Sequence, residues 1–280
     1  MRTTAVLNLK GGVGKTTTVI NMAAILAEGG ARVLVIDGDS QCNLTTFLGG
    51  NHDNLGTFAD MLRIGPDTIR PINTTVEDVD ILPADETLMD LDLTKAEEGA
   101  LKLHALRQFL SNDEGNWYDC DLLDCPPAPD TATTKKYRDS LRTRYDYVLI
   151  DCPPAFNAAT AAALLASDDV IIPMKLDAFN ISGMSVIFRQ IENMQRINPN
   201  LMVAGILPTM YYRGDHNATA LEEIRKAHLP LLHPIRRSDT VDRMTYKQEP
   251  LTKCSTRSGA LRDYRMAVEE YWAKGELLYD

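Results

Sequence analysis

The chain has few cysteines and no long apolar run, and each of these absences excludes a class of protein. Its five cysteines, an odd number without the paired spacing of a zinc site, are Cys42, Cys120, Cys125, Cys152 and Cys254. We therefore expect reduced thiols in a cytoplasmic protein. No apolar run approaches the ~20 residues that a membrane-spanning helix needs. The N-terminal residues lead directly into an apolar strand, so we expect neither a signal peptide nor a membrane association.

The chain also lacks an overall excess of positive charge, because its formal net charge is -10 over 280 residues. The charge is unevenly distributed, however. Between Leu221 and Arg265 there are ten Lys and Arg residues against six acidic ones. A basic region on an acidic protein is typical of a nucleic-acid contact, and the alternative is an ordinary solvated surface.

The most informative segment is a glycine-rich turn that follows the apolar run Ala5–Leu7. A strand, a glycine-rich loop and a helix opening with Lys15 and Thr16 form the usual cradle for nucleotide phosphates. Glycines allow successive backbone N–H groups to converge on phosphate oxygens. The lysine reaches the β- and γ-phosphates, and the threonine hydroxyl binds Mg²⁺. The expected ATP-binding residues of this loop are Lys10, Gly11, Gly12, Val13, Gly14, Lys15, Thr16 and Thr17.

Apolar strands alternate with helical segments along most of the chain. This alternation predicts an α/β fold, namely a doubly wound, mostly parallel sheet with helices on both faces, in a single domain over 1–280. The ligand is expected at the carboxyl ends of the strands. The expected strands are Arg32–Asp37, Val79–Leu82, Tyr147–Asp151, Asp169–Pro173 and Met202–Leu207. The expected helices are Thr16–Gly29, Asp92–Leu110, Ser182–Arg196, Ala218–Ala227 and Gly259–Leu278.

One segment is present twice. Tyr118–Ala128 and Tyr145–Ala155 are identical at eight of eleven positions, and only one copy can occupy the central strand. The first copy places Asp121 where a buried strand needs an apolar side chain, and an unpaired buried carboxylate is unfavourable by several kcal/mol. We therefore predict that the second copy forms the strand and that residues 111–138, approximately, are an insertion.

Carboxylates follow two of the expected strands. Asp37 and Asp39 follow the apolar run Arg32–Ile36, where they can hold Mg²⁺ waters or orient a nucleophilic water. A polar turn is the alternative for this segment taken alone. Asp151 ends an entirely apolar strand, which is the position of a Walker B carboxylate that helps to hold Mg²⁺. The two prolines that follow Asp151 argue against a helix cap.

These elements together resemble the ParA/MinD family of ATPases, and within it the ParA/Soj-type partitioning ATPases. The first glycine of the usual phosphate loop is replaced by Leu9, and the additional lysine, Lys10, is the signature of the deviant Walker A loop. The resemblance covers Thr4 to about Leu251 apart from the insertion, and includes Asp37–Asn43, Asp151–Pro154 and Leu207–Tyr211.

The resemblance implies a role for each matching position. Lys10 reaches the partner's phosphates in an ATP-bound homodimer, Lys15 binds phosphate, and Asp39 positions the hydrolytic water. Metal binding falls to Thr16, Asp37 and Asp151. The adenine pocket is expected at Thr209, Met210, Pro234 and Ile235. Contacts to DNA are expected from Arg213, Arg236, Arg237, Arg243 and Lys247, although the segments around Arg213 and Arg236 differ from the family pattern.

The resemblance implies a nucleoid-associated, Mg²⁺-dependent ATPase that segregates DNA. ATP binding drives a dimer that binds DNA non-specifically, and hydrolysis stimulated by a DNA-bound ParB-like partner resets it. A MinD-like positioning ATPase, or a switch for another cargo, is an alternative, but the acidic C-terminal segment from Glu269 lacks the basic face of a membrane-binding helix. A third alternative is an ATPase of the nitrogenase iron-protein type, in which cysteines of two subunits hold a cluster between them. Cys152 is the only cysteine that suggests such a ligand.

Overall fold

In the computed structural model, residues 1–49, 56–67, 69–97, 99–110 and 144–279 are described. They form a seven-stranded sheet with the order β3-β4-β2-β5-β1-β6-β7, in which all neighbours are parallel except β3 and β4. The strands are β1 (Arg2–Val6), β2 (Val33–Asp37), β3 (Ile72–Asn73), β4 (Val79–Leu82), β5 (Tyr147–Asp151), β6 (Asp169–Lys175) and β7 (Met202–Thr209). The doubly wound, mostly parallel sheet predicted from the sequence is confirmed.

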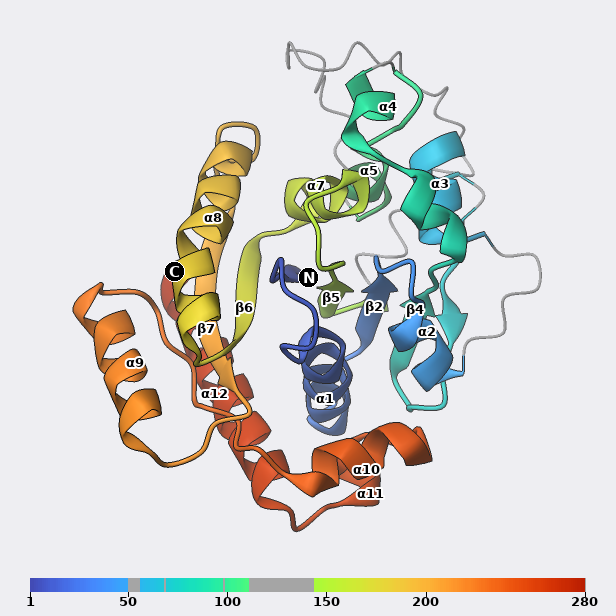
Figure 1. The fold of residues 1–280 in the computed structure, drawn as a ribbon. Helices are drawn as coiled ribbons and strands as arrows, with labels where there is room; N and C mark the ends of the chain where they lie inside the picture. Colours follow the sequence, from blue (N-terminus) through green and yellow to red (C-terminus); the bar gives the residue numbers. More distant parts are fainter. Residues whose placement is uncertain (50–55, 68, 98, 111–143, 280) are drawn as a thin grey trace.

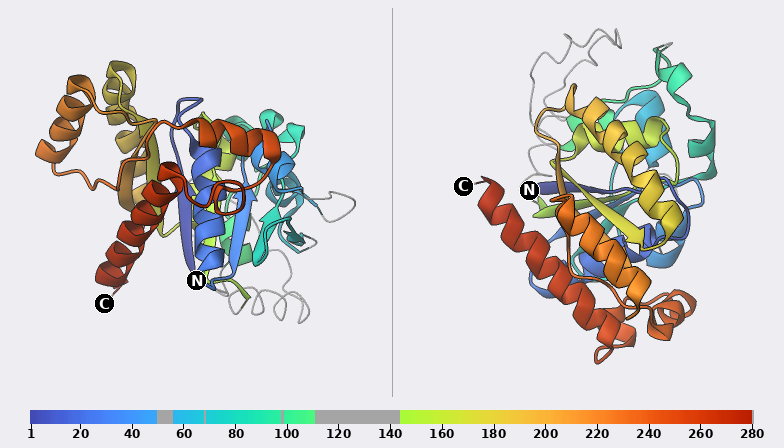
Figure 2. Two further views of the ribbon diagram at one scale, coloured as in Figure 1. Left: turned by 90° about the horizontal axis from the view of Figure 1, so that it is seen from below. Right: turned by 60° about the vertical axis from the view of Figure 1, so that its left-hand side comes forward.

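Helices cover both faces of the sheet (Figure 1). The helices of one face are α1 (Lys15–Glu28), α2 (Asn43–Leu48), α10 (Asp239–Lys247), α11 (Leu251–Cys254) and α12 (Gly259–Tyr279). Those packed with the other face are α3 (Phe58–Ile64), α4 (Leu93–Glu97), α5 (Ala105–Leu110), α7 (Ala158–Ala166), α8 (Ala178–Gln195) and α9 (Asp215–Lys226), with the 3₁₀ helix η1 (Glu86–Asp90). The two views of Figure 2 show α12 running along the outside of the body.

The strand sequences explain this layering. Side chains alternate between the two faces of a strand, so an entirely apolar strand feeds two cores at once. In β2, Leu34 and Ile36 pack with one core, whereas Val33 and Val35 pack with the other. All four are fully buried.

The second copy of the duplicated segment forms β5, which lies between β2 and β1 at the centre of the sheet. Its side chains from Val148 to Ile150 are fully buried. The prediction for the central strand is therefore confirmed. The first copy and the predicted insertion at about 111–138 lie outside the described residues.

The predicted helix over Asp92–Leu110 is wrong as a continuous element. Helix α4 ends at Glu97 and α5 begins at Ala105, with Gly99 at a φ of +75° between them. A left-handed residue cannot continue a right-handed helix, so the chain turns there. In the described part of the chain, no helix is long and apolar enough to span a membrane.

Candidate nucleotide-binding site

Three neighbouring strands bring the predicted site residues to one edge of the sheet. In the register of the sheet, Asp151 at the end of β5 is paired with Asp37 of β2 on one side and with Val6 of β1 on the other. The glycine-rich loop begins just after β1 and leads into α1. The carboxyl edge of parallel strands is where α/β proteins bind ligands, so this arrangement defines the candidate site.

The loop has the backbone of an anion cradle. Gly12 and Gly14 have φ values of +71° and +88°, which side chains rarely adopt, and Gly14 is the N-cap of α1. A Cβ built on Gly11 or Gly12 would meet none of the described atoms within 4 Å, so the space above both residues is open. The start of a 14-residue helix and free backbone amides favour a phosphate at this position.

Lys15 is held inside the loop rather than in solvent. Only 7% of the residue is exposed, and its Nζ donates a hydrogen bond to the carbonyl oxygen of Lys10 at 2.9 Å. Burial lowers the pKa of Lys15, while the negative charges of Asp151 and Asp39 oppose this effect. The ammonium group is thus partly desolvated, a state in which a phosphate would interact with it strongly.

Asp151 is the unsatisfied group of the site. It is 1% exposed, and neither carboxylate oxygen has a hydrogen-bond partner of normal geometry among the described residues. Burial and the charge of Asp37 raise the pKa of Asp151 well above its ordinary value, against the smaller effects of the Thr16 hydroxyl and Lys15. A buried carboxylate with free oxygens fits a hydrated Mg²⁺ ion, which would supply the missing partners.

The residues present therefore fit a magnesium nucleotide. Thr16, the first threonine of α1, and Asp151 are the groups that would hold the ion. Among the described residues, no three His, Cys, Asp or Glu side chains converge as a protein-only metal cage. This agrees with Mg²⁺ chemistry, since Mg²⁺ keeps several waters and takes its remaining oxygens from one or two side chains and the phosphates.

Asp37 is fully engaged by its own chain. Its Oδ2 accepts hydrogen bonds from the backbone amide of Thr45 at 2.9 Å and from its hydroxyl at 2.7 Å, and its Oδ1 accepts from the amide of Asp39 at 3.1 Å. Burial raises the pKa of Asp37 to about 6, although these hydrogen bonds oppose the shift. Asp37 thus fixes the backbone on which the half-buried Asp39 is carried, and a direct role in metal binding stays a prediction.

Close backbone packing fixes the same segment to β5. The amide of Gly38 donates to the carbonyl oxygen of Asp151 at 2.9 Å, and a Cβ on Gly38 would lie only 2.8 Å from that oxygen. Any side chain at position 38 would separate the two strands at the site. Gly38 is therefore required by the approach of the two carboxylate-bearing segments.

Two residues that support the site, one beside the loop and one beside Asp37, were not predicted from the sequence. Asn8 is 1% exposed, its Oδ1 accepts from the amide of Lys10 at 3.0 Å, and its Nδ2 donates to the carbonyl oxygen of Pro173 at 2.8 Å. Thr45 anchors Asp37 as described above. A buried Asn immediately after an apolar strand was the available signal for the first; Thr45 gave none, because its partner lies eight residues earlier across a turn.

The predicted adenine-binding residues lie on two segments joined by backbone hydrogen bonds. The Thr209 hydroxyl donates to the carbonyl oxygen of Val13 at 2.8 Å and so ties the phosphate loop to β7. The amide of Ile235 donates to the carbonyl oxygen of Pro208 at 2.7 Å. Ile235 is 2% exposed and packs in the core, whereas Met210 is 39% exposed. No pocket for a base is defined by these contacts, so this assignment stays a prediction.

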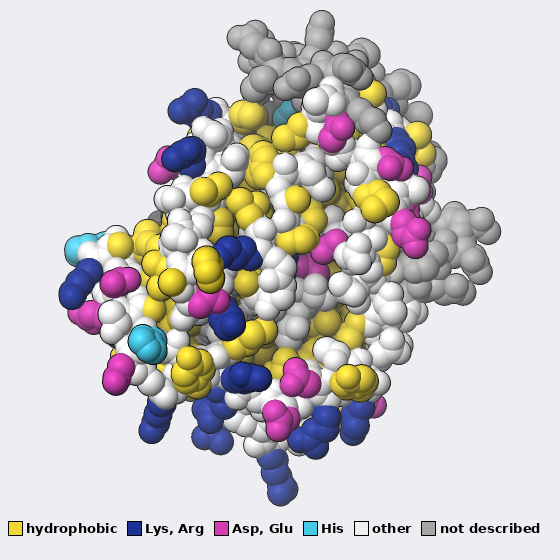
Figure 3. Space-filling model, in the orientation of Figure 1, with side chains coloured by type: hydrophobic (Ala, Val, Ile, Leu, Met, Phe, Trp, Pro, Cys, Tyr) yellow, Lys and Arg dark blue, Asp and Glu magenta, His cyan; other side chains and the backbone are white. Residues whose placement is uncertain are grey.

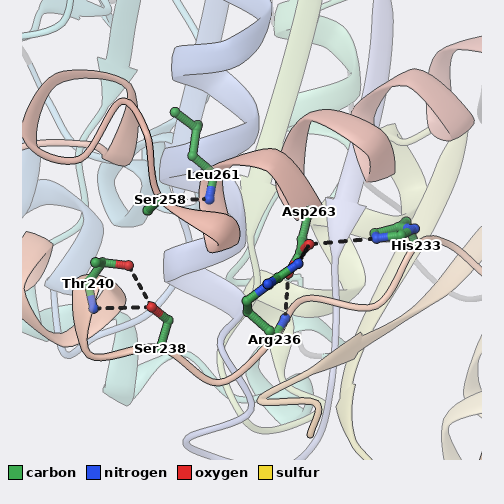
Figure 4. A network of polar contacts seen from close by, with 7 residues as sticks. All are labelled: His233, Arg236, Ser238, Thr240, Ser258, Leu261 and Asp263. Carbon is green, nitrogen blue, oxygen red and sulfur yellow. Dashed lines mark hydrogen bonds and ion pairs between the residues drawn. The ribbon is translucent and has the colours of Figure 1, made fainter. Parts of the chain in front are cut away.

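Arg236 is engaged in a clamp to α12 (Figure 4). Its Nε and Nη2 donate to the two carboxylate oxygens of Asp263 at 2.6 and 2.7 Å, and its backbone amide donates to the same carboxylate at 3.0 Å. His233 lies 3.7 Å from Asp263. The guanidinium group also occupies the space beside Gly259, where a Cβ would lie 2.7 Å from Nη1. The charge of Arg236 is thus neutralised within the chain.

The other residues predicted to contact DNA are exposed but lie on different elements. Arg243 and Lys247 are on α10, Arg237 precedes that helix, and Arg213 lies between β7 and α9. Lys and Arg side chains gather along the lower edge of the molecule, where α10 and α11 lie (Figure 3). The exposed basic residues of the segment 237–257, which we call the α10–α11 rim, are Arg237, Arg243, Lys247, Lys253 and Arg257.

The fold and the loop together define a P-loop nucleotide-binding protein of the deviant Walker A type. The sequence profile of a family described as "AAA domain" matches residues 1–137 and 131–203. The first match contains the copy of the duplicated segment at 118–128, and the second contains the copy at 145–155.

Curated and solved proteins give a consistent result. The chromosome partitioning protein ParA of Caulobacter vibrioides is 33% identical over 232 residues, which cover 81% of this chain and 76% of the relative. The structure of apo McdA from Cyanothece superposes with a TM-score of 0.76 at 19% identity, covering 97% and 99% of the two chains. A Mycobacterium smegmatis structure described as cobyrinic acid a,c-diamide synthase with bound ADP and magnesium has a TM-score of 0.67 at 28% identity, covering 98% and 96%. The chain therefore belongs to the ParA/MinD family of ATPases.

Proposed function

We propose that this protein is a Mg²⁺-dependent DNA-partitioning ATPase, in which ATP binding produces a dimer that binds DNA non-specifically. Two charged groups beside an open glycine loop carry the nucleotide half of this proposal. One is the buried carboxylate of Asp151, which has no hydrogen-bond partner of normal geometry, and the other is the partly desolvated ammonium group of Lys15. The DNA half rests on the ParA relative and on the exposed basic residues of the α10–α11 rim.

Each residue of the loop would act on the triphosphate in a way that follows from its surroundings. The amides of Gly11 and Gly12 and the ammonium of Lys15 would bind phosphate oxygens, while Thr16 and Asp151 would hold the metal ion. Mg²⁺, when bound, neutralises charge on the phosphate oxygens. Asp39 would orient the attacking water from a backbone that Asp37 keeps fixed. Lys10 would complete the charge stabilisation in the partner subunit.

A coupling between the nucleotide and the rim is supported by the contacts of Asn21 on α1. This fully buried side chain donates to the carbonyl oxygen of Thr17 at 2.8 Å and accepts from the amide of Leu251 at 3.1 Å. Its Nδ2 also lies 3.3 Å from Sδ of Met244, the buried residue of α10. The first turn after the phosphate loop is thus joined directly to the two helices that carry the basic residues.

The cluster-binding alternative is disfavoured by Cys152. This residue is 1% exposed, and burial raises the pKa of its thiol far above the ordinary value. A cluster that bridges two subunits needs accessible thiolates, and a neutral thiol inside the sheet does not provide one.

Charge reversal on α10 tests the DNA contact. The double variant Arg243→Glu/Lys247→Glu is expected to lose DNA affinity in the ATP state and to keep ATP affinity, since neither residue lies at the loop. Each lost phosphate contact reduces the slope of log K against log salt by about one, so a dimer should lose about four. Fluorescence anisotropy with labelled duplexes at several salt concentrations measures both quantities.

The matched control is Arg225→Glu/Lys226→Glu, which reverses two adjacent exposed charges at the end of α9. It should retain the DNA affinity and the salt dependence of the unmodified protein. If the α10 variant binds DNA as well as this control does, the contact surface lies elsewhere, and Arg213 is the next residue to test.

A further inference from the structure

The side chain of Lys10 lies against the first turns of α8 in its own subunit. Its Nζ is 5.4 Å from the centroid of the Phe179 ring. Its Cε is 3.8 Å from the position that a Cβ on Gly183 would take. Phe179 and Gly183 are four residues apart on one helix and therefore lie on the same face. The lysine is thus in contact with two consecutive turns of α8.

The N-cap of α8 adds a favourable charge to this contact. The carboxylate of Asp177 caps the helix by accepting from the amide of Asn180 at 2.9 Å. Burial alone would raise the pKa of Asp177, but the Asn180 hydrogen bonds and the charges of Lys175 and Lys10 lower it. The ammonium group of Lys10 therefore lies in the field of a carboxylate as well as near an aromatic face.

The stability of helix α8 does not account for an exposed phenylalanine at position 179 or for a glycine at position 183. The ring of Phe179 is 78% exposed, although burial of a phenylalanine is normally favourable. Gly183 lies inside an 18-residue helix, where glycine is less favourable than alanine by about 1 kcal/mol, and it is not among the glycines with positive φ. A side chain longer than alanine at position 183 would occupy the space of the lysine stem.

We propose that Phe179 and Gly183 form a docking site for Lys10 in the nucleotide-free subunit, which makes Phe179 a positioning residue for the signature lysine. The ring attracts the ammonium group, and the missing side chain at position 183 makes room for the lysine stem. Lys10 must leave this site before it can act on a phosphate across a dimer. The consequence for dimerisation rests on the function proposed above, whereas the docking itself does not.

The size of the effect follows from the strength of such contacts. A cation–π interaction at an exposed site changes an equilibrium about two- to fivefold. Because each of two subunits releases one lysine, removal of the ring should raise the ATP-dependent dimer association constant by about 4- to 25-fold.

The docking is tested directly by NMR of the nucleotide-free protein with isotopically labelled lysine. The Lys10 ε-methylene signal is identified by its absence in Lys10→Arg. It should be shifted upfield by the ring current of Phe179, lose that shift in Phe179→Leu and keep it in Phe179→Tyr. Val186→Ala, at another exposed apolar position of α8, is the control and should change nothing. An unchanged Lys10 signal in Phe179→Leu would overturn the docking site.

The release step is tested by sedimentation equilibrium with a slowly hydrolysed ATP analogue. Phe179→Leu should dimerise with a dissociation constant about 4- to 25-fold lower than that of the unmodified protein, and Phe179→Tyr should match the unmodified protein. Equal or weaker dimerisation of Phe179→Leu contradicts the release step. If no variant dimerises with any nucleotide, the proposed function fails, while the NMR result still decides the docking.

Discussion

At the scale of single residues, the site is organised around the carboxylate of Asp151. Its buried charge is unfavourable as long as no cation or hydrogen-bond donor compensates it. Burial raises the pKa of Asp151, so the folded protein holds a proton at this group more tightly than the unfolded chain does. This group therefore favours the folded state at low pH, and its contribution to stability is lost as the pH rises from about 4 through its folded-state pKa. A bound cation reverses this effect, because it supplies the partner that the carboxylate lacks.

The variant Asp151→Asn should consequently stabilise the nucleotide-free protein and weaken its response to nucleotide. A neutral amide of the same shape removes the buried charge, so we expect a gain of about 1–3 kcal/mol at pH 8 and a smaller gain at pH 6. Thermal unfolding with and without Mg²⁺-ADP measures both effects. A variant that is less stable than the unmodified protein without nucleotide, or equally stabilised by Mg²⁺-ADP, contradicts the role given to Asp151.

The residues expected to contact the nucleotide could be predicted from the sequence more readily than the residues that hold them in place. The glycines and Lys15 could be predicted because strand, loop and helix follow one another within a short stretch, and Asp151 could be predicted because it ends an apolar strand. Asn8 and Thr45 act through hydrogen bonds to backbone and side chains whose position depends on the folded sheet. The clamp between Arg236 and Asp263 joins residues 27 apart, so Arg236 was assigned to DNA although its charge is neutralised internally.

At the scale of elements, the six parallel strands were predicted to within three residues because apolar runs mark them, whereas the two-residue antiparallel strand β3 was missed. Five short helices were missed, namely α2, α3, α7, α10 and α11. In α7, eight of nine residues are buried, so no polar face marks it. In α10 only Met244 is buried, so its short polar sequence resembles a loop. Each has only nine residues, so neither offers a periodic pattern long enough to identify a helix from the sequence alone.

The clamp to α12 makes a prediction at this scale. Asp263 is 2% exposed, and although burial acts against it, the hydrogen bonds and the charge of Arg236 lower its pKa. Asp263→Asn removes one charged partner and should lower stability by about 1–3 kcal/mol at pH 7. The loss should shrink as the pH falls through the folded-state pKa, because the wild-type carboxylate is then protonated too.

The clamp between Arg236 and Asp263 can act on stability alone, or it can also hold the segment 233–237 at a base pocket. ATP affinity distinguishes these two roles. If the segment 233–237 lines the base pocket, Asp263→Asn should weaken binding of ATP more than binding of inorganic triphosphate, which has no base. Calorimetric titration of both ligands measures the difference. Equal losses for the two ligands would assign the clamp to stability alone and remove Pro234 and Ile235 from the adenine pocket.

At the scale of the whole molecule, the candidate nucleotide site and the α10–α11 rim lie on different parts of one fold. The carboxyl edge of β1, β2 and β5 carries the loop and both carboxylates, while α10 and α11 place exposed basic side chains next to the helix that follows the loop. In the proposed function, this rim is the surface with which an acidic protein contacts DNA. Two copies brought together by nucleotide would present that surface twice, so DNA binding should require the ATP state.

The most direct test of this account is the mass of the particle in solution, measured by light scattering after gel filtration, followed by DNA binding of the same fractions. With ADP the unmodified protein should be a monomer without DNA affinity. With a slowly hydrolysed ATP analogue it should be a dimer that binds duplexes of unrelated sequence, and Lys10→Ala should bind nucleotide but neither dimerise nor bind DNA. A protein that remains monomeric with the ATP analogue, or that binds DNA equally well with and without it, would contradict the account.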